Sequence, residues 1–404
     1  MNKVVVIGGG ASGIVASIVA ARNGEHVTLL EGNDKCGKKI LLTGNGKCNY
    51  WNSDLSINNY FTDDFNMLKE IMCVDNQNKV FSFLSDIGIY PRIKNGYYYP
   101  YSNQASSVRE LLLKELEKSG VNIILSCKVE NVYKEKDKFV VKSNLDTIYA
   151  DKVIVATGSK ACPKTGSDGS GYDIAKSFGH RINNVLPALV QLRANDSSLK
   201  DLDGIRMDAK IFLSVDDKEI AQEEGEILFT DYGLSGICVF NLSGLVSKYL
   251  YYDKKVDIYL NLCPFLEESF YTWFTKRNDE IPNHTIEELL ESIFSYKLIL
   301  VLLKKMKLDR GVTWDNLKEV EKQEFSSMIE NYKLEINGTN LFDRAQVCTG
   351  GVPLNEVSSV MESKKEKGLY LVGELLDVDG KCGGFNLAFA WISGYLAGRG
   401  SFDD

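Results

Sequence analysis

The chain opens with short apolar runs separated by glycine-rich turns, a pattern typical of α/β proteins. Residues 4–7 are four consecutive β-branched residues, which predict a short buried parallel strand. An apolar segment over residues 14–22 predicts a helix, and residues 26–30 predict a second strand. The order strand, helix, strand favours a βαβ unit and hence a parallel sheet.

Later segments continue this pattern and add a middle region of different character. The further elements expected on the α/β side are helices near residues 65–87 and 106–119, a strand at 120–125, a hairpin from 128–133 and 139–143, strands at 152–158 and 368–373, and a helix at 385–398. The middle region is mainly strand-like at 188–262 and helical at 264–332, with a long apolar helix at 285–308 and a shorter charged one at 320–330.

The turn between the first strand and the first helix carries the motif G-x-G-x-x-G on Gly8, Gly10 and Gly13. In this setting the first glycine permits a tight turn, the second lets the backbone approach a pyrophosphate, and the third lets the helix pack on the strand. The helix N-terminus offers free N–H groups to phosphates, and Glu31 ends the second strand, where a carboxylate accepts hydrogen bonds from ribose hydroxyls. The motif therefore predicts dinucleotide binding. Glu31 would repel a 2′-phosphate, which leaves FAD and NAD ahead of NADP.

The sequence after Glu31 favours FAD over NAD. An NAD domain normally continues with another helix and strand, whereas here residues 37–49 form a glycine-rich segment with Lys38, Lys39 and Lys47. Such a loop suits an extended anionic ligand, although a solvated basic loop has the same composition.

The C-terminal segment contains a second glycine-rich turn. Gly383 and Gly384 precede the last apolar helix, whose N-terminus can present N–H groups to negative charge. A reduced flavin carries such charge at its N1 and O2 edge. A second complete G-x-G-x-x-G motif is missing, so NADH or NADPH is expected to dock transiently over the flavin rather than in a Rossmann domain of its own.

Four segments, residues 37–52, 156–180, 225–236 and 349–398, resemble the BaiN/YhiN-like family of bacterial FAD-dependent oxidoreductases. The resemblance spans nearly the whole chain. It implies an α/β fold with a glutathione-reductase-type Rossmann FAD domain, an inserted β-rich module and a helical module that together cover the flavin. The motifs and the resemblance give these expected cofactor-binding residues: Gly8, Gly10, Ala11, Ser12, Gly13, Glu31, Gly32, Lys38, Lys39, Gly44, Cys48, Asn49, Val129, Ala156, Thr157, Gly158, Gly373, Glu374, Asp377, Gly383, Gly384, Phe385 and Asn386.

Two departures from the family pattern limit what the resemblance implies. Many members have arginine at the position of Lys47, and lysine keeps the charge but loses the planar fork. Many also have His-x-Gly and then Ser-Gly-Pro where residues 231–237 read Asp-Tyr-Gly-Leu-Ser-Gly-Ile, so a histidine role there does not carry over.

The domain organisation follows from the same patterns. We expect a discontinuous FAD-binding domain over residues 1–187 and 345–404, a β-rich substrate-side domain over 188–263 and 334–344, and a helical insertion over 264–333.

Few side chains are candidates for chemistry beyond that of the cofactor. Asp231 and Tyr232 lie in a glycine-rich loop, either as proton donors or as an Asp-initiated turn. Cys48 and Cys382 form either a redox pair or, more simply, two small packing residues. His180 is expected to cap a helix end. The aromatic run at 97–101 is either the wall of a cavity or a half-buried strand.

Composition and charge narrow the possible partners. The 404 residues are 44% hydrophobic and 25% charged, near globular averages, with a net charge of −8 and no polybasic run. We therefore expect a small-molecule substrate, no nucleic acid and no membrane. Nine cysteines without a C-x-x-C pair fit the reducing cytoplasm and argue against a metal site such as a zinc ribbon.

These inferences predict an FAD-dependent oxidoreductase. The resemblance favours NAD(P)H-dependent reduction of a C=C bond conjugated to a carbonyl, in an enone or bile-acid-like substrate, by hydride transfer from flavin N5. The alternative is an FAD-dependent amine oxidase of the aminoacetone type that forms peroxide. Ranked below these are an RNA-modifying flavoprotein and a flavin-binding protein without turnover.

Overall fold

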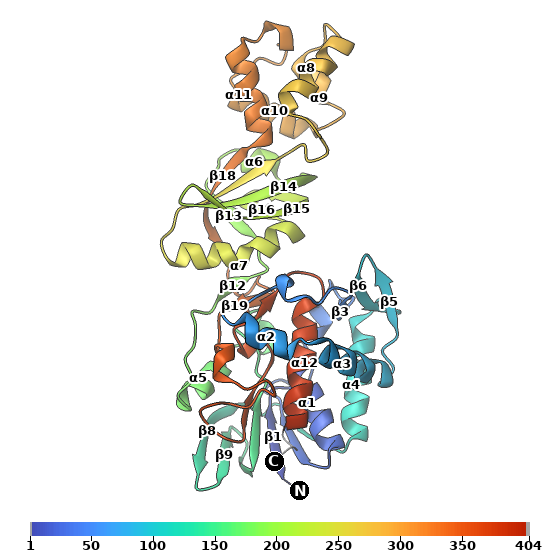
Figure 1. Cartoon of the computed structure of the whole chain (residues 1–404), viewed down its shortest axis with the longest axis vertical. Coiled ribbons are helices and arrows are strands. Elements are labelled where there is room, and N and C mark those ends of the chain that lie inside the picture. The colour runs from blue at the N-terminus through green and yellow to red at the C-terminus, as the bar shows by residue number, and fades with distance from the viewer. Residues whose placement is uncertain (1, 401–404) are drawn as a thin grey trace. The chain divides into compact units, whose positions relative to one another are not determined.

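A computed structural model describes residues 2–400 and divides them into two compact units (Figure 1). The first unit combines residues 2–186 with 342–400, and the second is Pro187–Leu341. Each unit has its own hydrophobic core. The segment expected as a separate helical insertion shares the core of the second unit with the strands.

The first unit is built on a five-stranded parallel sheet in the order β20-β11-β1-β2-β7. Its strands are β1 (Lys3–Ile7), β2 (His26–Leu30), β7 (Asn122–Ile124), β11 (Lys152–Val155) and β20 (Leu369–Leu371). Val5 in β1 lies opposite Thr28 in β2 and Val153 in β11. The apolar run of β1 is buried because strands lie on both of its sides and helices cover the sheet.

Helices α1 (Ala11–Arg22) and α12 (Phe385–Gly400) lie side by side in the first unit, although they come from opposite ends of the chain (Figure 1). Glycines allow their close approach, because a Cβ at Gly394 would lie 2.3 Å from the Ser12 carbonyl oxygen. A Cβ at Gly398 would lie 2.7 Å from the Ala16 carbonyl oxygen. The small residues of the last helix therefore place it against α1.

Two small antiparallel sheets and four further helices complete most of the first unit. The sheets are β3-β6-β5 (Trp51–Asn52, Tyr97–Pro100, Pro91–Lys94) and β10-β9-β8 (Thr147–Ala150, Lys138–Ser143, Val129–Glu135). The helices are α2 (Phe65–Ile71), α3 (Val74–Asp86), α4 (Ala105–Lys118) and α5 (Ser170–Ser177). Short elements of this unit are β4 (Tyr60–Phe61), β19 (Val347–Thr349) and β21 (Asp379–Gly380), and β12 (Leu186–Ala188) lies at its boundary along the chain.

The helix expected near residues 65–87 is two helices. Cys73 has extended backbone angles, φ −63° and ψ 154°, and separates α2 from α3. Apolar periodicity alone does not reveal this break, because both helices bury apolar residues in the same core.

The second unit contains a closed barrel with the strand order β13-β16-β15-β14-β17-β18. Its strands are β13 (Leu192–Ala194), β14 (Arg206–Val215), β15 (Lys218–Thr230), β16 (Gly233–Ser235), β17 (Val256–Asn261) and β18 (Tyr332–Thr339). Its helices are α6 (Leu199–Leu202), α7 (Ile237–Tyr251), α8 (Phe270–Glu280), α9 (Ile286–Leu290), α10 (Tyr296–Lys305) and α11 (Glu319–Glu330).

The prediction of a single apolar helix at 285–308 is wrong, because the structure has two helices there, α9 and α10. Thr285 and Glu288 form a capping box at the start of α9, and Ser295 with φ −63° and ψ 145° starts α10 as its N-cap. No helix within residues 2–400 combines the length and apolar character needed to cross a bilayer.

Candidate functional site

The carboxyl ends of three parallel strands meet at one edge of the five-stranded sheet. Gly8 follows β1, Ala156 follows β11 and Gly373 follows β20. The Ala156 N–H donates to the Ile7 carbonyl at 2.8 Å, and the Val372 N–H donates to the Val155 carbonyl at 3.1 Å. In open α/β sheets ligands bind outside this edge, and these three turns each contain residues expected to bind the cofactor.

The N-terminus of α1 is open toward this edge. Gly10 is the N-cap, and among the residues that the structure describes no side chain caps the helix and no heavy atom would lie within 4 Å of a Cβ at Gly10. The other two glycines of the motif are packed instead. A Cβ at Gly13 would lie 1.9 Å from the Gly8 carbonyl oxygen, and Gly8 has φ +103°. The turn thus brings free N–H groups and the positive end of the helix dipole to an empty space.

Glu31 is nearly buried at the end of β2, and its carboxylate borders the same turn. Its Oε2 accepts the Gly9 N–H at 2.7 Å, and its Oε1 accepts both the Asn33 N–H and the Asn33 side-chain amide at 2.7 Å. Sequence reasoning missed Asn33, although its position two residues after Glu31 is a signal that could have found it. The carboxylate is fixed in orientation, and its Oε2, which accepts the Gly9 N–H, has a second lone pair for a hydroxyl donor.

The two lysines expected to face an anionic ligand have partners within the protein. Lys39 Nζ lies 2.7 Å from Glu374 Oε2, which also accepts the Ser159 hydroxyl at 2.9 Å. Lys38 Nζ lies 2.7 Å from Asp34 Oδ1. Both charges are therefore partly neutralised where the structure places them.

The second glycine-rich turn is held against β3 and β6. A Cβ at Gly384 would lie 2.5 Å from the Trp51 carbonyl oxygen, and Asn52 donates to the Gly383 carbonyl at 2.8 Å. The Tyr60 hydroxyl donates to the Phe385 carbonyl at 3.2 Å. Gly394 packs on Ser12 and Gly398 on Ala16, so α12 runs parallel to α1 and the N-termini of both helices point in the same direction.

Three other expected cofactor residues are occupied by bonds that hold loops together. Asp377 accepts the Gly350 N–H at 3.0 Å and the Asn183 amide at 2.6 Å. Asn386 exchanges two hydrogen bonds of 2.8 Å with the Gly380 backbone. The Asn49 amide donates to the carbonyls of Trp51 and Tyr98 at 3.1 Å. These side chains shape the turns around the site.

The remaining expected residues are distributed as follows. Ala11 and Ser12 form the first turn of α1, Val129 begins β8, and Thr157 and Gly158 follow β11. The Thr157 hydroxyl oxygen is buried and has no hydrogen-bond partner within residues 2–400. Gly32 follows Glu31 with open space at its Cβ, and Gly44 adopts φ +56° in the lysine-containing loop.

Cys48 lies fully buried in that loop. Burial raises the pKa of its thiol to about 12, so the sulfur stays protonated at neutral pH. This protonation favours a packing role over the redox pair with Cys382 that the sequence left open.

Asp231 and Tyr232 lie in the second unit, in the turn between β15 and β16. The Tyr232 hydroxyl accepts the Asn340 amide at 3.1 Å, and the Arg193 guanidinium lies 5.1 Å from its ring centre. Because the hydroxyl oxygen accepts this bond, its own hydrogen remains available for donation. Asp231 is exposed.

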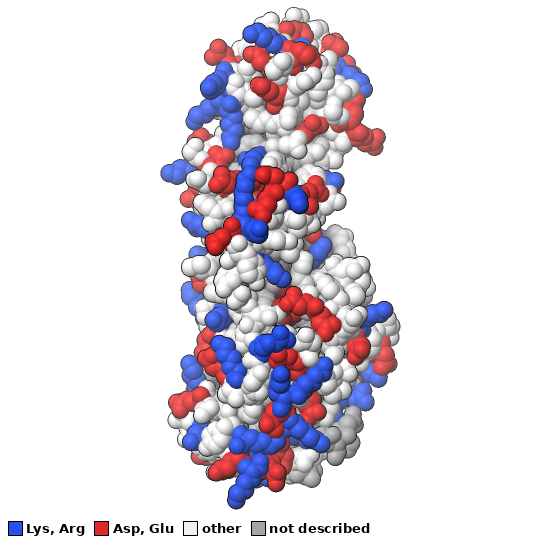
Figure 2. All heavy atoms as spheres, turned by 60° about the vertical axis from the view of Figure 1, so that its left-hand side comes forward, with Lys and Arg blue, Asp and Glu red and all other residues white. Residues whose placement is uncertain are grey.

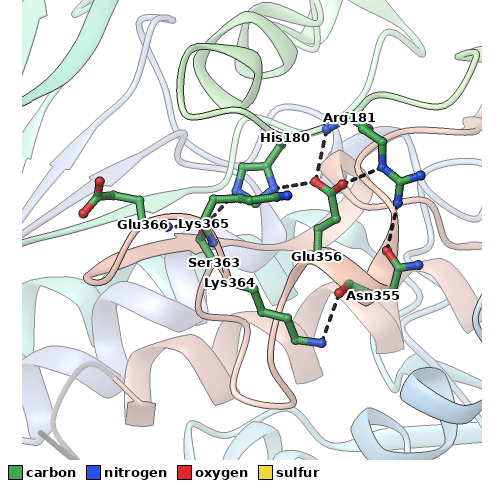
Figure 3. A network of polar contacts seen from close by, with 8 residues as sticks. All are labelled: His180, Arg181, Asn355, Glu356, Ser363, Lys364, Lys365 and Glu366. Atoms are coloured by element: carbon green, nitrogen blue, oxygen red, sulfur yellow. Dashed lines mark hydrogen bonds and ion pairs between the residues drawn. The ribbon is translucent and has the colours of Figure 1, made fainter.

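His180 belongs to a buried network at the end of α5 (Figure 3). Its Nε2 lies 2.8 Å from Ser363 Oγ, and its Nδ1 lies 2.9 Å from Glu356 Oε2. Ser363 Oγ already accepts the N–H groups of Lys365 and Glu366, both at 3.0 Å, so it donates to Nε2. His180 is then the neutral Nδ1–H tautomer.

The order Ser363, His180, Glu356 matches a hydrolytic triad, but the serine oxygen has no free lone pair for nucleophilic attack. Glu356 also accepts the Arg181 N–H at 3.1 Å and Arg181 Nε at 2.7 Å. The network therefore links α5 to the loops near residues 355 and 365 and has no catalytic geometry.

The residues present at the sheet edge fit FAD. The open space at Gly10 in front of an uncapped helix suits a pyrophosphate, and the fixed carboxylate of Glu31 suits a ribose. Together with the parallel helix α12, the fold and this site define a Rossmann-type FAD-binding flavoprotein of the oxidoreductase class.

The chain belongs to the HI0933-like family, because residues 2–400 match the family described as "HI0933-like protein Rossmann domain". It is 40% identical over 99% of its length, and 98% of the relative's, to the "3-dehydro-bile acid delta(4,6)-reductase" of Clostridium scindens. It is 28% identical over 98% of its length, and 96% of the relative's, to the "Ribosomal RNA dihydrouridine synthase" of Escherichia coli. The resemblance to the BaiN/YhiN-like family is thus confirmed.

A solved structure shares the fold at low identity. The "Mycobacterium smegmatis Sdh1 complex in the apo form" is 12% identical, with a TM-score of 0.52, and the match covers 100% of this chain and 68% of that one. This likeness concerns the fold only.

Proposed function

We propose that this protein is an FAD-dependent reductase that saturates a C=C bond conjugated to a carbonyl, with NADH or NADPH as electron donor. The observation that carries the proposal is the 40% identity, over nearly both whole chains, to a relative whose name describes reduction of a 3-oxo compound with double bonds at positions 4 and 6. The open N-terminus of α1 supports it, because this reaction needs a bound redox cofactor.

In this proposal the chain binds and orients FAD through four features. The N–H groups at the start of α1 bind the pyrophosphate beside Gly10, and Glu31 accepts the ribose hydroxyls. Thr157 lies next to the Rossmann turn, and the N-terminus of α12 stabilises negative charge on the flavin ring. When bound, FAD supplies hydride transfer between the nicotinamide and the carbon of the double bond farthest from the carbonyl.

The reduction also needs a proton at the carbon next to the carbonyl. We assign this proton to Tyr232, with Asp231 as the second candidate. The Asn340 amide fixes the Tyr232 hydroxyl from the acceptor side and leaves its hydrogen for transfer. The nearby Arg193 guanidinium stabilises the negative charge that the ring oxygen gains when the proton leaves.

A second candidate function is reduction of uridine in RNA, which the name of the E. coli relative favours. The ring double bond of uracil is conjugated to a carbonyl, so the reaction class is the same and only the substrate differs. The charge of the chain weighs against RNA. Its net charge is −8, and on the face in Figure 2 Lys and Arg side chains are interspersed with Asp and Glu.

The experiment is anaerobic turnover of the purified yellow protein. We expect NADH or NADPH to be oxidised when a 3-oxo-Δ4 steroid is added and the saturated ketone to appear in equal amount. Tyr232→Phe should lower kcat about 100-fold with little change in flavin content. Dihydrouridine formed in ribosomal RNA without steroid turnover would favour the second candidate, and peroxide release from an amine without NAD(P)H would favour an oxidase instead.

A further inference from the structure

A cavity of about 520 Å³ lies in the first unit beside α5 (Figure 1). It is lined by residues between 168 and 176 at the start of α5, by Lys160 in the loop after β11, and by the segment 182–185 that follows the helix. All of these residues belong to the first unit. The cavity has room for a small organic ligand, since ligand sites in proteins enclose roughly 300–1,000 Å³.

The wall of this cavity carries a lysine without an anionic partner. Lys176 Nζ lies 3.7 Å from Asp173 Oδ1, and Lys128 Nζ lies 3.3 Å from Asp168 Oδ2, so both carboxylates of the wall have a cation beside them. Lys160 forms no ion pair with any residue in the range 2–400. An amine in this position is a binding point for an anionic group such as a phosphate.

Gly169 places Lys160 at the cavity. Gly169 has φ +81°, and a Cβ there would lie 2.7 Å from Lys160 Cγ and 2.9 Å from Lys160 Cε. The lysine stem therefore lies against the backbone at the start of α5, in space that exists because residue 169 has no side chain. This contact restricts the positions of the amine and keeps it beside the cavity.

The segment 182–185 adds an apolar surface and an amide to the wall. Ile182 and Val185 are half-buried and line the cavity. The Asn184 side chain is exposed and makes no hydrogen bond with the residues that the structure describes. A carboxamide can accept from the amino group of adenine and donate to its N7 at the same time. The cavity thus combines a cation, an amide and an apolar surface, a set that suits a phosphorylated adenosine.

The cavity shares residues with the turn that follows β20 at the cofactor edge. The Tyr172 hydroxyl donates to the Glu374 carbonyl at 3.5 Å, and the Asn183 amide donates to the Asp377 carboxylate at 2.6 Å. Tyr172 and Asn183 both line the cavity. Single side chains therefore separate a ligand in the cavity from a turn whose residues are expected to bind FAD.

We propose that this cavity binds the phosphorylated adenosine half of the nicotinamide nucleotide that reduces the flavin. Lys160 binds a phosphate group, and Asn184 pairs with the edge of the adenine base. Ile182 and Val185 pack against its ring. The chain has one G-x-G-x-x-G motif, at the FAD turn, so the donor needs a site of another kind. The proposal rests on the proposed function, because it takes NADH or NADPH as the electron donor, and it goes further by giving that donor a site.

The lysine is tested in the half-reaction that needs no second substrate. The FAD-loaded protein is mixed anaerobically with NADH or NADPH, and the rate of flavin reduction is followed over a range of donor concentrations. Lys160→Gln should raise the half-saturating donor concentration about tenfold and leave the maximal rate unchanged. A rise for both donors assigns Lys160 to the pyrophosphate, and a rise for NADPH alone assigns it to the 2′-phosphate. Lys164→Gln, which removes an exposed lysine of the same loop outside the cavity wall, should change neither value.

The adenine contact is tested with a matched pair of donors. In the hypoxanthine analogue of NADH a carbonyl oxygen replaces the amino group of adenine, so Asn184 can make only one of its two hydrogen bonds to the base. The wild type should be half-saturated by NADH at a concentration about fivefold lower than by the analogue. Asn184→Ala should abolish this difference. A preference of the same size in the variant would contradict the contact.

Two results overturn the nucleotide site. One is a half-saturating concentration of each donor that is the same in Lys160→Gln and the wild type. The other is an equal rise in Lys164→Gln, which would show that the lysines act only through the general charge of the surface. Equilibrium titration with 2′,5′-ADP, a fragment of NADPH that carries no electrons, tests the cavity without any redox step. If neither donor reduces the flavin but 2′,5′-ADP binds the wild type about tenfold tighter than Lys160→Gln, the proposed function fails and the nucleotide site stands.

Discussion

Two polar regions of the first unit differ in how many of their hydrogen-bonding groups have partners within the protein. At the start of α1, no side chain caps the helix and the space at Gly10 is open. At the end of α5, each side-chain nitrogen and oxygen of His180, Glu356 and Ser363 makes a hydrogen bond within the protein (Figure 3). The first region needs a ligand to complete it, and the second completes itself.

This difference matters because the second region carries the more familiar catalytic residues. A serine, a histidine and a glutamate within hydrogen-bonding distance invite a hydrolytic interpretation, yet the geometry assigns them a structural role. The glycine turn before α1, which has no reactive side chain, is the region with open space for a ligand. Unsatisfied groups and open space are thus better guides to function here than residue types.

The largest effect on stability is expected from the closed network. Glu356→Ala leaves the His180 Nδ1–H and the Arg181 N–H without an acceptor, which costs about 3 kcal/mol of unfolding free energy. Urea unfolding of the FAD-free protein measures it. The matched change Glu366→Ala removes only the half-exposed pair with Lys134 and should cost less than about 1 kcal/mol. Equal losses in the two variants would contradict the account of the network.

A smaller effect, on the affinity for FAD, is expected from a change at Glu31 beside the start of α1. Glu31→Ala removes the carboxylate at the ribose position and should raise the Kd for FAD about tenfold. Glu25→Ala is the control, because Glu25 is a buried carboxylate near the other end of β2 that holds Asn2. It should lower stability and leave the Kd for FAD unchanged. A Kd that responds equally to both changes would mean that Glu31 acts only through the fold.

The smallest expected effect is a pH dependence. Burial lowers the pKa of His180 from its usual 6.5, with Lys365 acting in the same direction and Glu356 opposing. A lowered folded-state pKa gives stability that is present above pH 6.5 and is lost as the pH falls toward the folded-state value, because the unfolded chain binds the proton first.

Urea unfolding at pH 7.5 and pH 5.5 isolates this contribution, since Glu356, whose pKa is lowered from 4.5, loses its contribution only at more acid pH. The wild type should lose more unfolding free energy over this interval than His180→Asn, because only the wild type has a histidine with a lowered folded-state pKa. Identical losses in the wild type and the variant would contradict the lowered pKa of His180 in the folded state.

The sequence was sufficient for elements that depend on local pattern. The β-branched run of β1, the glycines before α1 and the two short strands of the hairpin β8–β9 can each be predicted from a few neighbouring residues. The break at Ser295 was missed because the apolar residues on both sides continue one helical period while the cap is a single serine.

Features that depend on distant residues could not be predicted. The contact of α12 with α1 joins residues more than 350 positions apart, and the packing of Gly394 on Ser12 and of Gly398 on Ala16 appears only in the folded structure. Lys39, Asp377 and Asn386 have the residue types of ligand contacts, but Glu374, Gly350 and Gly380 already use them. Spacing along the chain does not show which polar groups the fold satisfies by itself.

The central claim is that the open space at Gly10 holds the FAD pyrophosphate, and the flavin-to-protein ratio of purified Gly10→Val tests it most directly. Gly10 has extended backbone angles and no described heavy atom near its Cβ, so the variant should unfold at the same urea concentration as the FAD-free wild type and yet bind no FAD. Gly311→Val, also in open space but in the second unit, should remain yellow, whereas Gly13→Val should fail to fold because of the overlap with Gly8. A folded Gly10→Val protein with one FAD per chain would contradict the account.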